Sequence, residues 1–206
     1  MTLAGRWWVI ALLAACYGSA NAASTGIMVG TAALNGQPFQ TDLTGIANLR
    51  LHLHDGDFRI VGSDAGEVMI HTDGKNRAQT RKMQVQFKRT GDSLDITFLH
   101  VPKNQVQVTI AVPKETNLYA RMRGGDLSVD GVRGDKDLEL TGGDLQIQVP
   151  DPAEYGPVDL SVRFGDVRAN QFGNPKGWLG NSLRRDGNGR YRLHAHVFAG
   201  DLTLRR

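Results

Sequence analysis

The chain has 206 residues, 40% of them hydrophobic and 22% charged, which are ordinary values for a globular protein and exclude a fibrous or a disordered chain. Its formal net charge of +3 lacks the strongly basic character of nucleic-acid-binding domains, so no nucleic-acid partner is expected. Glycine is enriched, with 25 residues against 7 prolines, and this indicates many tight turns.

Residues 1–22 are predicted to be an export signal. MTLAGR carries a positive charge, WWVIALLAACYG is apolar, and Ala20-Asn21-Ala22 is typical of a cleavage site. The apolar run is shorter than the ~20 residues that span a bilayer, and no later run reaches that length, so no transmembrane helix is expected. The protein is therefore predicted to be exported, to the periplasm or to the cell surface.

A second interpretation of this segment stays open. Leu13-Ala14-Ala15-Cys16 matches a bacterial lipobox, whose cysteine is lipidated, and Cys16 would then be a membrane anchor followed by a short tether. Cys16 is the only cysteine, so under either interpretation the folded domain has no disulfide and no thiolate metal site. Residues 23–47 are assigned to an N-terminal segment or tether with the first strand, and residues 48–206 to a single β-repeat domain.

Several segments alternate apolar and polar residues, as half-buried strands do. They are LRLHLH at 49–54, QVQVTIAV at 105–112 and YRLHAHV at 191–197. Between the first two lies a basic cluster of Lys75, Arg77, Arg81, Lys82, Lys88 and Arg89. The favoured interpretation of this cluster is a solvated hairpin arm, and the alternative is a contact with an anionic envelope component.

A Gly-Asp dipeptide followed by alternating residues recurs six times: GDFRI at 56, GDSLDI at 91, GDLSV at 125, GDLQI at 143, GDVRA at 165 and GDLTL at 200. The intervals predict an underlying unit of ~17–20 residues with two short strands. Alternation places one set of side chains inward: Leu49, Leu51, Leu53, Leu127, Val129, Leu138, Leu140, Leu145 and Ile147. It places Ser128, Glu139, Gln146 and Gln148 outward.

So short a unit cannot bury its apolar face alone, but stacked units can. We therefore predict an all-β fold, a β-solenoid or β-roll of short two-stranded rungs, with almost no helix. The alternative is a β-sandwich, because short strands with regular turns also describe that fold.

The repeated glycine and aspartate are expected to shape the turns. Glycine provides a positive φ or a close backbone approach, and aspartate accepts hydrogen bonds from amides two residues further on. Stacking would place Asp126, Asp144 and then Asp166 above one another at ~4.8 Å. Plain capped turns are favoured over a calcium ladder, because the GGDL units lack the second Gly-x-Asp element of calcium-binding β-rolls.

Two other groups of residues are candidate sites. His52/His54 and His194/His196 each offer two imidazoles on one strand face, but the pairs are expected at opposite ends of the solenoid, and surface histidines are favoured. Trp178 lies in the irregular segment 172–189, near Phe172 and Tyr191. It is interpreted as a plug over the terminal rung, with a glycan-stacking platform as the alternative.

Three stretches resemble the bacterial putative adhesin family of β-strand repeat domains of unknown function. They are LRLHLHDGDFRIVGSDAGEVMIH at 49–71, the stretch from VTIAVPKETNL to GGDLQIQV at 108–149, and GRYRLHAHVFAGDLTL at 189–204. The resemblance implies an exported all-β repeat domain, and it implies no enzyme activity.

No catalytic motif occurs in the sequence, so no catalytic, metal-binding or cofactor-binding residue and no cofactor is predicted. The expected function is that of a non-enzymatic envelope module, structural or adhesin-like, whose partner is an unidentified protein or glycan of the envelope or cell surface. Two alternatives stay open: a secreted enzyme acting on envelope polysaccharide, and a calcium-dependent adhesive surface.

Overall fold

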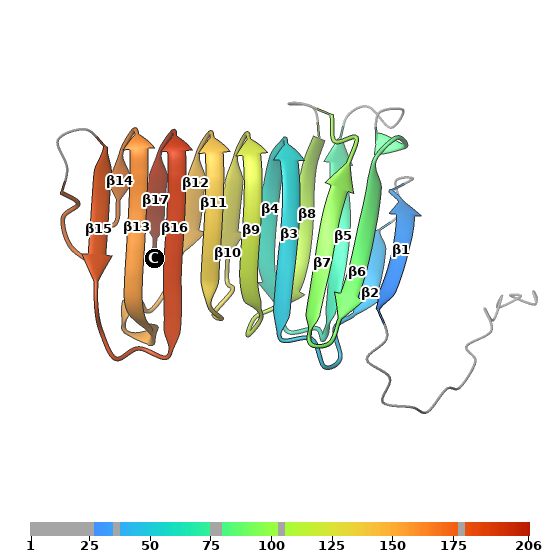
Figure 1. The fold of residues 1–206 in the computed structure, drawn as a ribbon, viewed down its shortest axis with the longest axis horizontal. Coiled ribbons are helices and arrows are strands. Elements are labelled where there is room, and N and C mark those ends of the chain that lie inside the picture. The colour runs from blue at the N-terminus through green and yellow to red at the C-terminus, as the bar shows by residue number, and fades with distance from the viewer. Residues whose placement is uncertain (1–26, 35–37, 75–79, 103–105, 177–179) are drawn as a thin grey trace, which may run out of the picture.

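The computed structural model describes residues 27–34, 38–74, 80–102, 106–176 and 180–206 (Figure 1). The predicted export signal, the lipobox Cys16, two members of the basic cluster (Lys75 and Arg77) and Trp178 lie outside these residues. Within the described ranges, no helix has the length and apolar character needed to cross a membrane.

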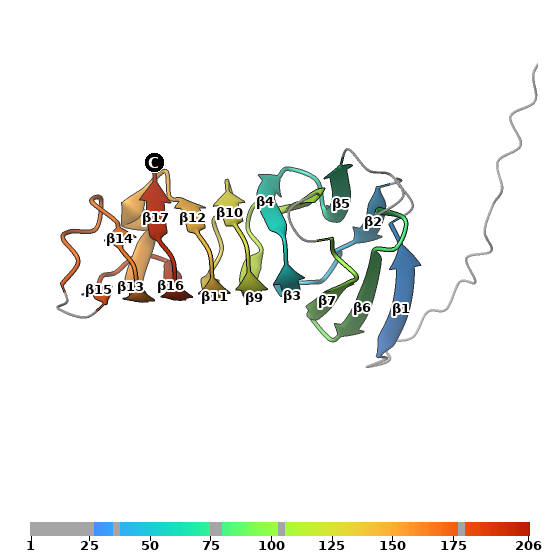
Figure 2. The same cartoon turned by 90° about the horizontal axis from the view of Figure 1, so that it is seen from above.

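The described elements form two β-sheets that face each other (Figures 1 and 2). The first sheet contains, in spatial order, β1 (Met28–Ala33), β6 (Gln84–Thr90), β7 (Ser93–Leu99), β3 (Asn48–Asp55), β9 (Asn117–Gly124), β11 (Lys136–Gly142), β16 (Tyr191–Ala199), β13 (Tyr155–Phe164) and β15 (Asn181–Arg185). The second contains β14 (Val167–Arg168), β17 (Leu202–Arg205), β12 (Leu145–Gln148), β10 (Leu127–Asp130), β4 (Asp57–Ser63), β8 (Val106–Pro113), β5 (Glu67–Gly74) and β2 (Phe39–Asp42). A 3-10 helix, Pro152–Glu154, precedes β13.

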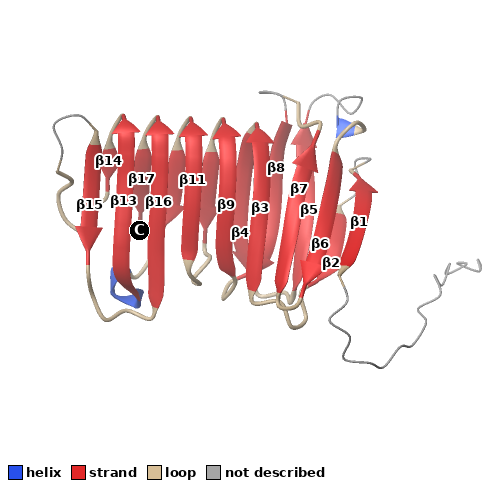
Figure 3. Ribbon diagram, in the orientation of Figure 1, coloured by secondary structure: helices blue, strands red, loops and turns tan. Residues whose placement is uncertain are grey.

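Strands dominate the described residues (Figure 3), and the all-β prediction is confirmed. Both sheets are mixed. Parallel ladders run through the middle of each sheet, for example Leu127 beside Leu145 and Leu145 beside Leu202. Antiparallel pairs lie towards the ends, such as β1 with β6 and β13 with β15. Two open, mixed sheets that face each other form a sandwich-like arrangement, which is the alternative prediction. The antiparallel strands do not fit the predicted solenoid of stacked rungs.

The core lies between the sheets and follows the predicted alternation. Every side chain predicted to point inward is buried, from Leu49 in β3 to Ile147 in β12. The four residues predicted to point outward are half-buried or exposed. Burial of aliphatic side chains contributes about 1.5–3 kcal/mol each, so this continuous core is the main source of stability.

Five Gly-Asp dipeptides connect a strand of the first sheet to the next strand of the second. We call them the Gly-Asp corners: Gly56-Asp57, Gly125-Asp126, Gly143-Asp144, Gly165-Asp166 and Gly200-Asp201. Gly143 has a φ of +119°, and a Cβ placed on it would lie 2.0 Å from the carbonyl oxygen of Gly125. The corners therefore stack backbone against backbone, at a distance that any side chain would prevent.

The sixth Gly-Asp dipeptide is different. Gly91-Asp92 forms the turn of the antiparallel hairpin between β6 and β7, where Thr90 is opposite Ser93. Its interpretation as another stacked repeat marker is wrong, because Gly91 adopts its positive φ of +61° in a turn with open space around it.

The spatial order of the corners also departs from chain order. β17 lies between β12 and β14, so Asp201, and not Asp166, is next to Asp144. The reason lies in segment 172–189, which contains β15. This strand pairs antiparallel with the outer edge of β13, and the chain then returns on the inner side of β13 as β16 and β17. β15 is thus the terminal strand at this end of the first sheet.

Candidate functional site

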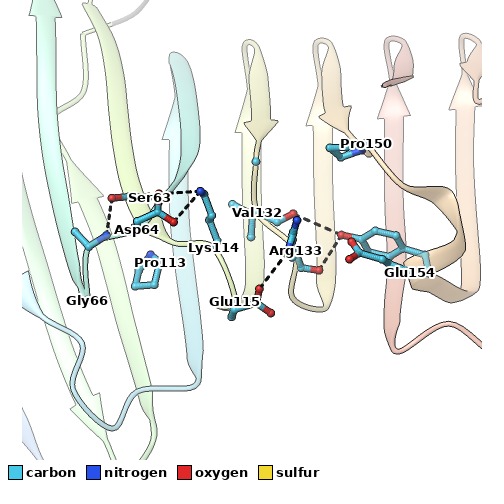
Figure 4. Close-up of a pocket in the computed structure, with 13 residues that line it drawn as sticks. Ser63, Asp64, Gly66, Pro113, Lys114, Glu115, Val132, Arg133, Pro150 and Glu154 are labelled. Atoms are coloured by element: carbon cyan, nitrogen blue, oxygen red, sulfur yellow. Dashed lines mark hydrogen bonds and ion pairs between the residues drawn. The ribbon is translucent and has the colours of Figure 1, made fainter.

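A cavity of about 530 Å³ lies beside four turns that follow the carboxyl ends of neighbouring strands in the second sheet (Figure 4). The turns follow β4, β8, β10 and β12, and they contribute Ser63–Gly66, Pro113–Glu115, Gly131–Arg133 and residues between Pro150 and Tyr155. Neighbouring strands in this part of the sheet are parallel, so their carboxyl ends meet at one edge and their turns converge there.

Charged side chains along this cavity neutralise one another. Lys114 Nζ lies 2.7 Å and 2.9 Å from the two carboxylate oxygens of Asp64. Arg133 lies 3.9 Å from Glu115, which also accepts a hydrogen bond of 2.5 Å from the Tyr191 hydroxyl. The turns are tied together by their backbones, since the Arg133 amide donates to the Lys114 carbonyl at 2.6 Å. The cavity is therefore bordered by paired charges and held on linked turns.

A fully buried lysine lies behind the wall of this cavity. Lys136, the first residue of β11, has 0% exposed surface, and its Nζ donates to the Gly134 carbonyl at 3.2 Å and to the Tyr155 hydroxyl. The Nζ also lies 4.6 Å from the centroid of the Tyr155 ring. Tyr155 in turn donates to the Arg133 carbonyl at 2.8 Å. Tyr155 also lines the cavity, so Lys136 contacts a residue of the cavity wall.

Burial dominates the electrostatics of this pair. It lowers the pKa of Lys136 to about 7, although the negative charges of Asp135 and Glu154 act in the opposite direction. Burial likewise raises the pKa of Tyr155, with a further contribution from Glu154, so this phenol stays protonated. At neutral pH Lys136 is thus close to the midpoint of its titration inside the core.

Sequence reasoning missed Lys136, although a signal was present. In KDLELT the lysine is in phase with Leu138 and Leu140, so the period-two alternation places it inward. Its strand neighbours at the same level are Leu118 and Leu193, both buried. No comparable pattern marks Tyr155 or the turns that form the cavity, because those turns are brought together only by the stacking of strands.

The predicted aspartate row exists, and its members are hydrogen-bonded. The Asp144 amide donates to the Asp126 carboxylate at 3.3 Å, the Asp201 amide to Asp144 at 3.1 Å, and the Asp166 amide to Asp201 at 3.1 Å. The expected partners were amides two residues further along the same turn. The partners are instead the amides of neighbouring corners, because the corners stack in register.

The two His-x-His pairs lie on the same outward face of the first sheet, on β3 and β16, with β9 and β11 between them. The prediction that they lie at opposite ends is wrong, because β16 is inserted next to β11. His194 Nδ1 lies 3.0 Å from Asp137, and His196 Nδ1 lies 2.8 Å from the Ser161 hydroxyl. In the part of the chain that the structure describes, no three His, Cys, Asp or Glu side chains gather as ligands for one metal ion.

The described members of the basic cluster lie next to or on a hairpin strand. Arg81 and Lys82 are exposed before β6, while Lys88 and Arg89 belong to β6 itself. Lys88 is opposite Asp95 across the hairpin, and Arg89 donates to the Thr44 carbonyl at 2.8 Å. Lys88 and Arg89 are therefore part of a hairpin, as the favoured interpretation has it, and Arg81 and Lys82 lie just before it.

Comparisons with known proteins identify a shared fold. No family model matches the chain, and no curated protein matches it. A crystal structure of a putative cell adhesion protein from Clostridium sporogenes ATCC 15579 is similar, with a TM-score of 0.53 and 11% identity over 86% of this chain and 99% of that one. A putative adhesin from Bacteroides fragilis NCTC 9343 has a TM-score of 0.28 and 6% identity, covering 88% of this chain and 98% of that one. The first of these shows that the chain shares the fold of that putative cell adhesion protein.

Proposed function

We propose that this protein is a non-enzymatic, adhesin-like interaction module that is exported to the periplasm or cell surface and binds a component of the envelope. The observation that carries the proposal is the state of the polar groups in the cavity. Lys114 and Arg133 are paired with carboxylates, and the buried amine of Lys136 is hydrogen-bonded to Tyr155. Such a site could recognise an envelope component by its shape and by polar groups held in fixed positions.

The fold and the sequence support this proposal in different ways. The structure from Clostridium sporogenes carries the name of a cell adhesion protein and matches over nearly its whole length. The N-terminal segment has the pattern of an export signal, with a lipid anchor through Cys16 as the alternative. A shared fold alone does not establish a shared function. The export pattern supports the proposed location at the envelope independently of the fold.

We further propose that the parallel part of the molecule is a short solenoid. Each of the five Gly-Asp corners joins one strand of each sheet, and successive corners are hydrogen-bonded backbone to backbone, as from the Gly143 amide to the Ala199 carbonyl at 2.9 Å. Such units bury their apolar faces only against each other. The antiparallel strands β1, β2, β5 and β6 then cover one end of the stack, and β15 covers part of the other.

The test is a binding experiment with the labelled full chain and envelope preparations of cells that produce it. We expect saturable retention on the envelope and no release of sugar from envelope polysaccharide. Fractionation of the producing cells, with the intact mass of the extracted protein, separates the soluble exported form from the form lipidated at Cys16. Release of soluble sugar would support the enzyme alternative, and absence of retention would contradict the proposal.

A further inference from the structure

Two phenylalanines stand exposed near the ends of two neighbouring strands of the first sheet: Phe198 on the outward face of β16, and Phe164 at the last position of β13. The exposed fractions are 52% for Phe164 in β13 and 44% for Phe198 in β16. Their ring centroids lie 5.4 Å apart, with an interplanar angle of 80°. The Arg163 guanidinium lies 5.8 Å and 5.9 Å from the two ring centroids. These rings contribute little to the core, so their burial inside the protein does not explain them.

The aromatic pair belongs to a row of side chains that crosses the strands. Strand register aligns Arg123 of β9, Thr141 of β11, Phe198 of β16 and Arg163 of β13. All four side chains are exposed. We call these residues, together with Phe164, the arginine–phenylalanine row. At ~4.8 Å per strand, the two arginines are about 14 Å apart, with Phe198 on a strand between them and Phe164 beside Arg163.

The arginines of this row differ from others on the same face. Arg121, one row away, pairs with Asp137 at 3.1 Å and with Glu139 at 2.9 Å. Arg184 pairs with Asp159 at 2.5 Å. Among the described residues, neither Arg123 nor Arg163 has a carboxylate within ion-pair distance, so the row offers two uncompensated positive charges to a partner.

We propose that the arginine–phenylalanine row binds an acidic polysaccharide, a chain of uronic-acid sugars that lies across the strands. The inference rests on the proposed interaction function and names its partner class. Guanidinium groups bind carboxylates in a two-pronged geometry, and Arg123 and Arg163 would hold two acidic groups of one chain. Phe198, with the Phe164 ring packed edge to face against it, provides an apolar surface for a sugar ring beside those groups.

The shape of the surface favours a narrow polymer over an anionic membrane. The exposed carboxylate of Asp166 follows Phe164 at the adjoining corner. A bilayer lying on the row would also meet these corner carboxylates, and like charges would repel it. A single glycan chain needs to contact only the row itself, whereas a bilayer covers the row and the corners together.

The test measures binding of the full chain to polygalacturonate, with dextran as the neutral polymer and phosphatidylglycerol vesicles as the anionic membrane. We expect binding to polygalacturonate that weakens with salt and no binding to dextran. The double variant Arg123→Gln/Arg163→Gln should weaken binding at least tenfold, and so should Phe164→Ala/Phe198→Ala. The matched control is Arg59→Gln/Arg205→Gln, which removes the same charge from two arginines paired with Asp130 and should change binding less than twofold.

Thermal melts of every variant verify that the fold is retained. The inference is overturned if polygalacturonate does not bind, if the control variant weakens binding as much as the row variants, or if only the vesicles bind. Parallel retention assays on envelope preparations separate the two proposals. Retention of the native chain without any effect of the row variants overturns the row alone, whereas no retention at all overturns the interaction function.

Discussion

The carboxylate of Asp144 accepts a hydrogen bond of 3.1 Å from the backbone amide of Asp201, 57 residues further along the chain. The two residues occupy equivalent positions in neighbouring Gly-Asp corners. The same contact is made by Asp201 to the Asp166 amide and by Asp126 to the Asp144 amide. Each aspartate therefore satisfies a neighbour's backbone donor at a place where the chain turns and the regular ladder is interrupted.

Replacing Asp144 tests this contact. We expect Asp144→Ala to lower the free energy of unfolding by about 1 kcal/mol, because the Asp201 amide loses its side-chain acceptor. Urea unfolding measures the change. Asp186→Ala is the control, since Asp186 is exposed outside the strands, and its removal should cost less than about 0.5 kcal/mol. Equal effects of the two substitutions would contradict the role of the ladder.

The same ladder predicts the response to chelators. Amide donors already face three of the corner carboxylates, so we expect the melting temperature to be the same with EDTA and with added calcium. Repulsion between neighbouring aspartates, about 1 kcal/mol per pair in water, is offset by these hydrogen bonds and by solvation. A melting temperature that rises with calcium would revive the calcium-dependent adhesive surface.

Gly143 should tolerate no side chain. We expect Gly143→Ala to lower the free energy of unfolding by about 3 kcal/mol, because φ is +119° and the new Cβ would lie 2.0 Å from the Gly125 carbonyl oxygen. The matched control is Gly66→Ala, where a Cβ meets nothing within 4 Å. If chemical denaturation shows equal losses for both variants, the corners do not depend on close backbone stacking.

Lys136 should make stability depend on pH. Its folded pKa of about 7 lies below the unfolded value of 10.5, so between these values the unfolded chain binds more protons and stability rises with pH. From pH 6 to 9.5 this contribution is about 3 kcal/mol. Lys136→Met should therefore be more stable than the native chain at pH 6, and the difference should shrink by pH 9.5. Urea midpoints across this pH range measure it.

Tyr155→Phe separates burial from hydrogen bonding at the same place. The variant keeps the ring and removes the hydroxyl that Lys136 donates to and that itself donates to the Arg133 carbonyl. We expect a loss of about 1–3 kcal/mol at pH 6, with less at pH 9.5, because an unpaired buried ammonium costs more than an unpaired amine. A loss that is independent of pH would show that Lys136 does not titrate in this range.

The alternation of apolar and polar residues determined much of this fold. Leu127, Val129, Leu145 and Ile147 were predicted inward and are buried, because a strand in a two-layer protein has only two faces and period two assigns them. The Gly-Asp dipeptides indicated the corners because two adjacent residues are enough to predict such a turn. Glycine allows the positive φ, and the short aspartate side chain accepts a hydrogen bond. The same alternation puts Lys136 in phase with Leu138 and Leu140, but the lysine was not predicted to be inward, because a charged side chain is rarely buried.

Only the tertiary structure decided which units are neighbours. β15 pairs with the outer edge of β13, so β16 and β17 lie between strands that precede them in the chain. This order places Asp201 next to Asp144, and it places the strand of His194 three positions from the strand of His52 in the same sheet. The cavity and the arginine–phenylalanine row arise in the same way, from turns or side chains on separate strands. Parallel strands of similar sequence can stack in several orders with similar burial. Chain order alone therefore does not determine which side chains meet, and the pairing of the whole sheet does.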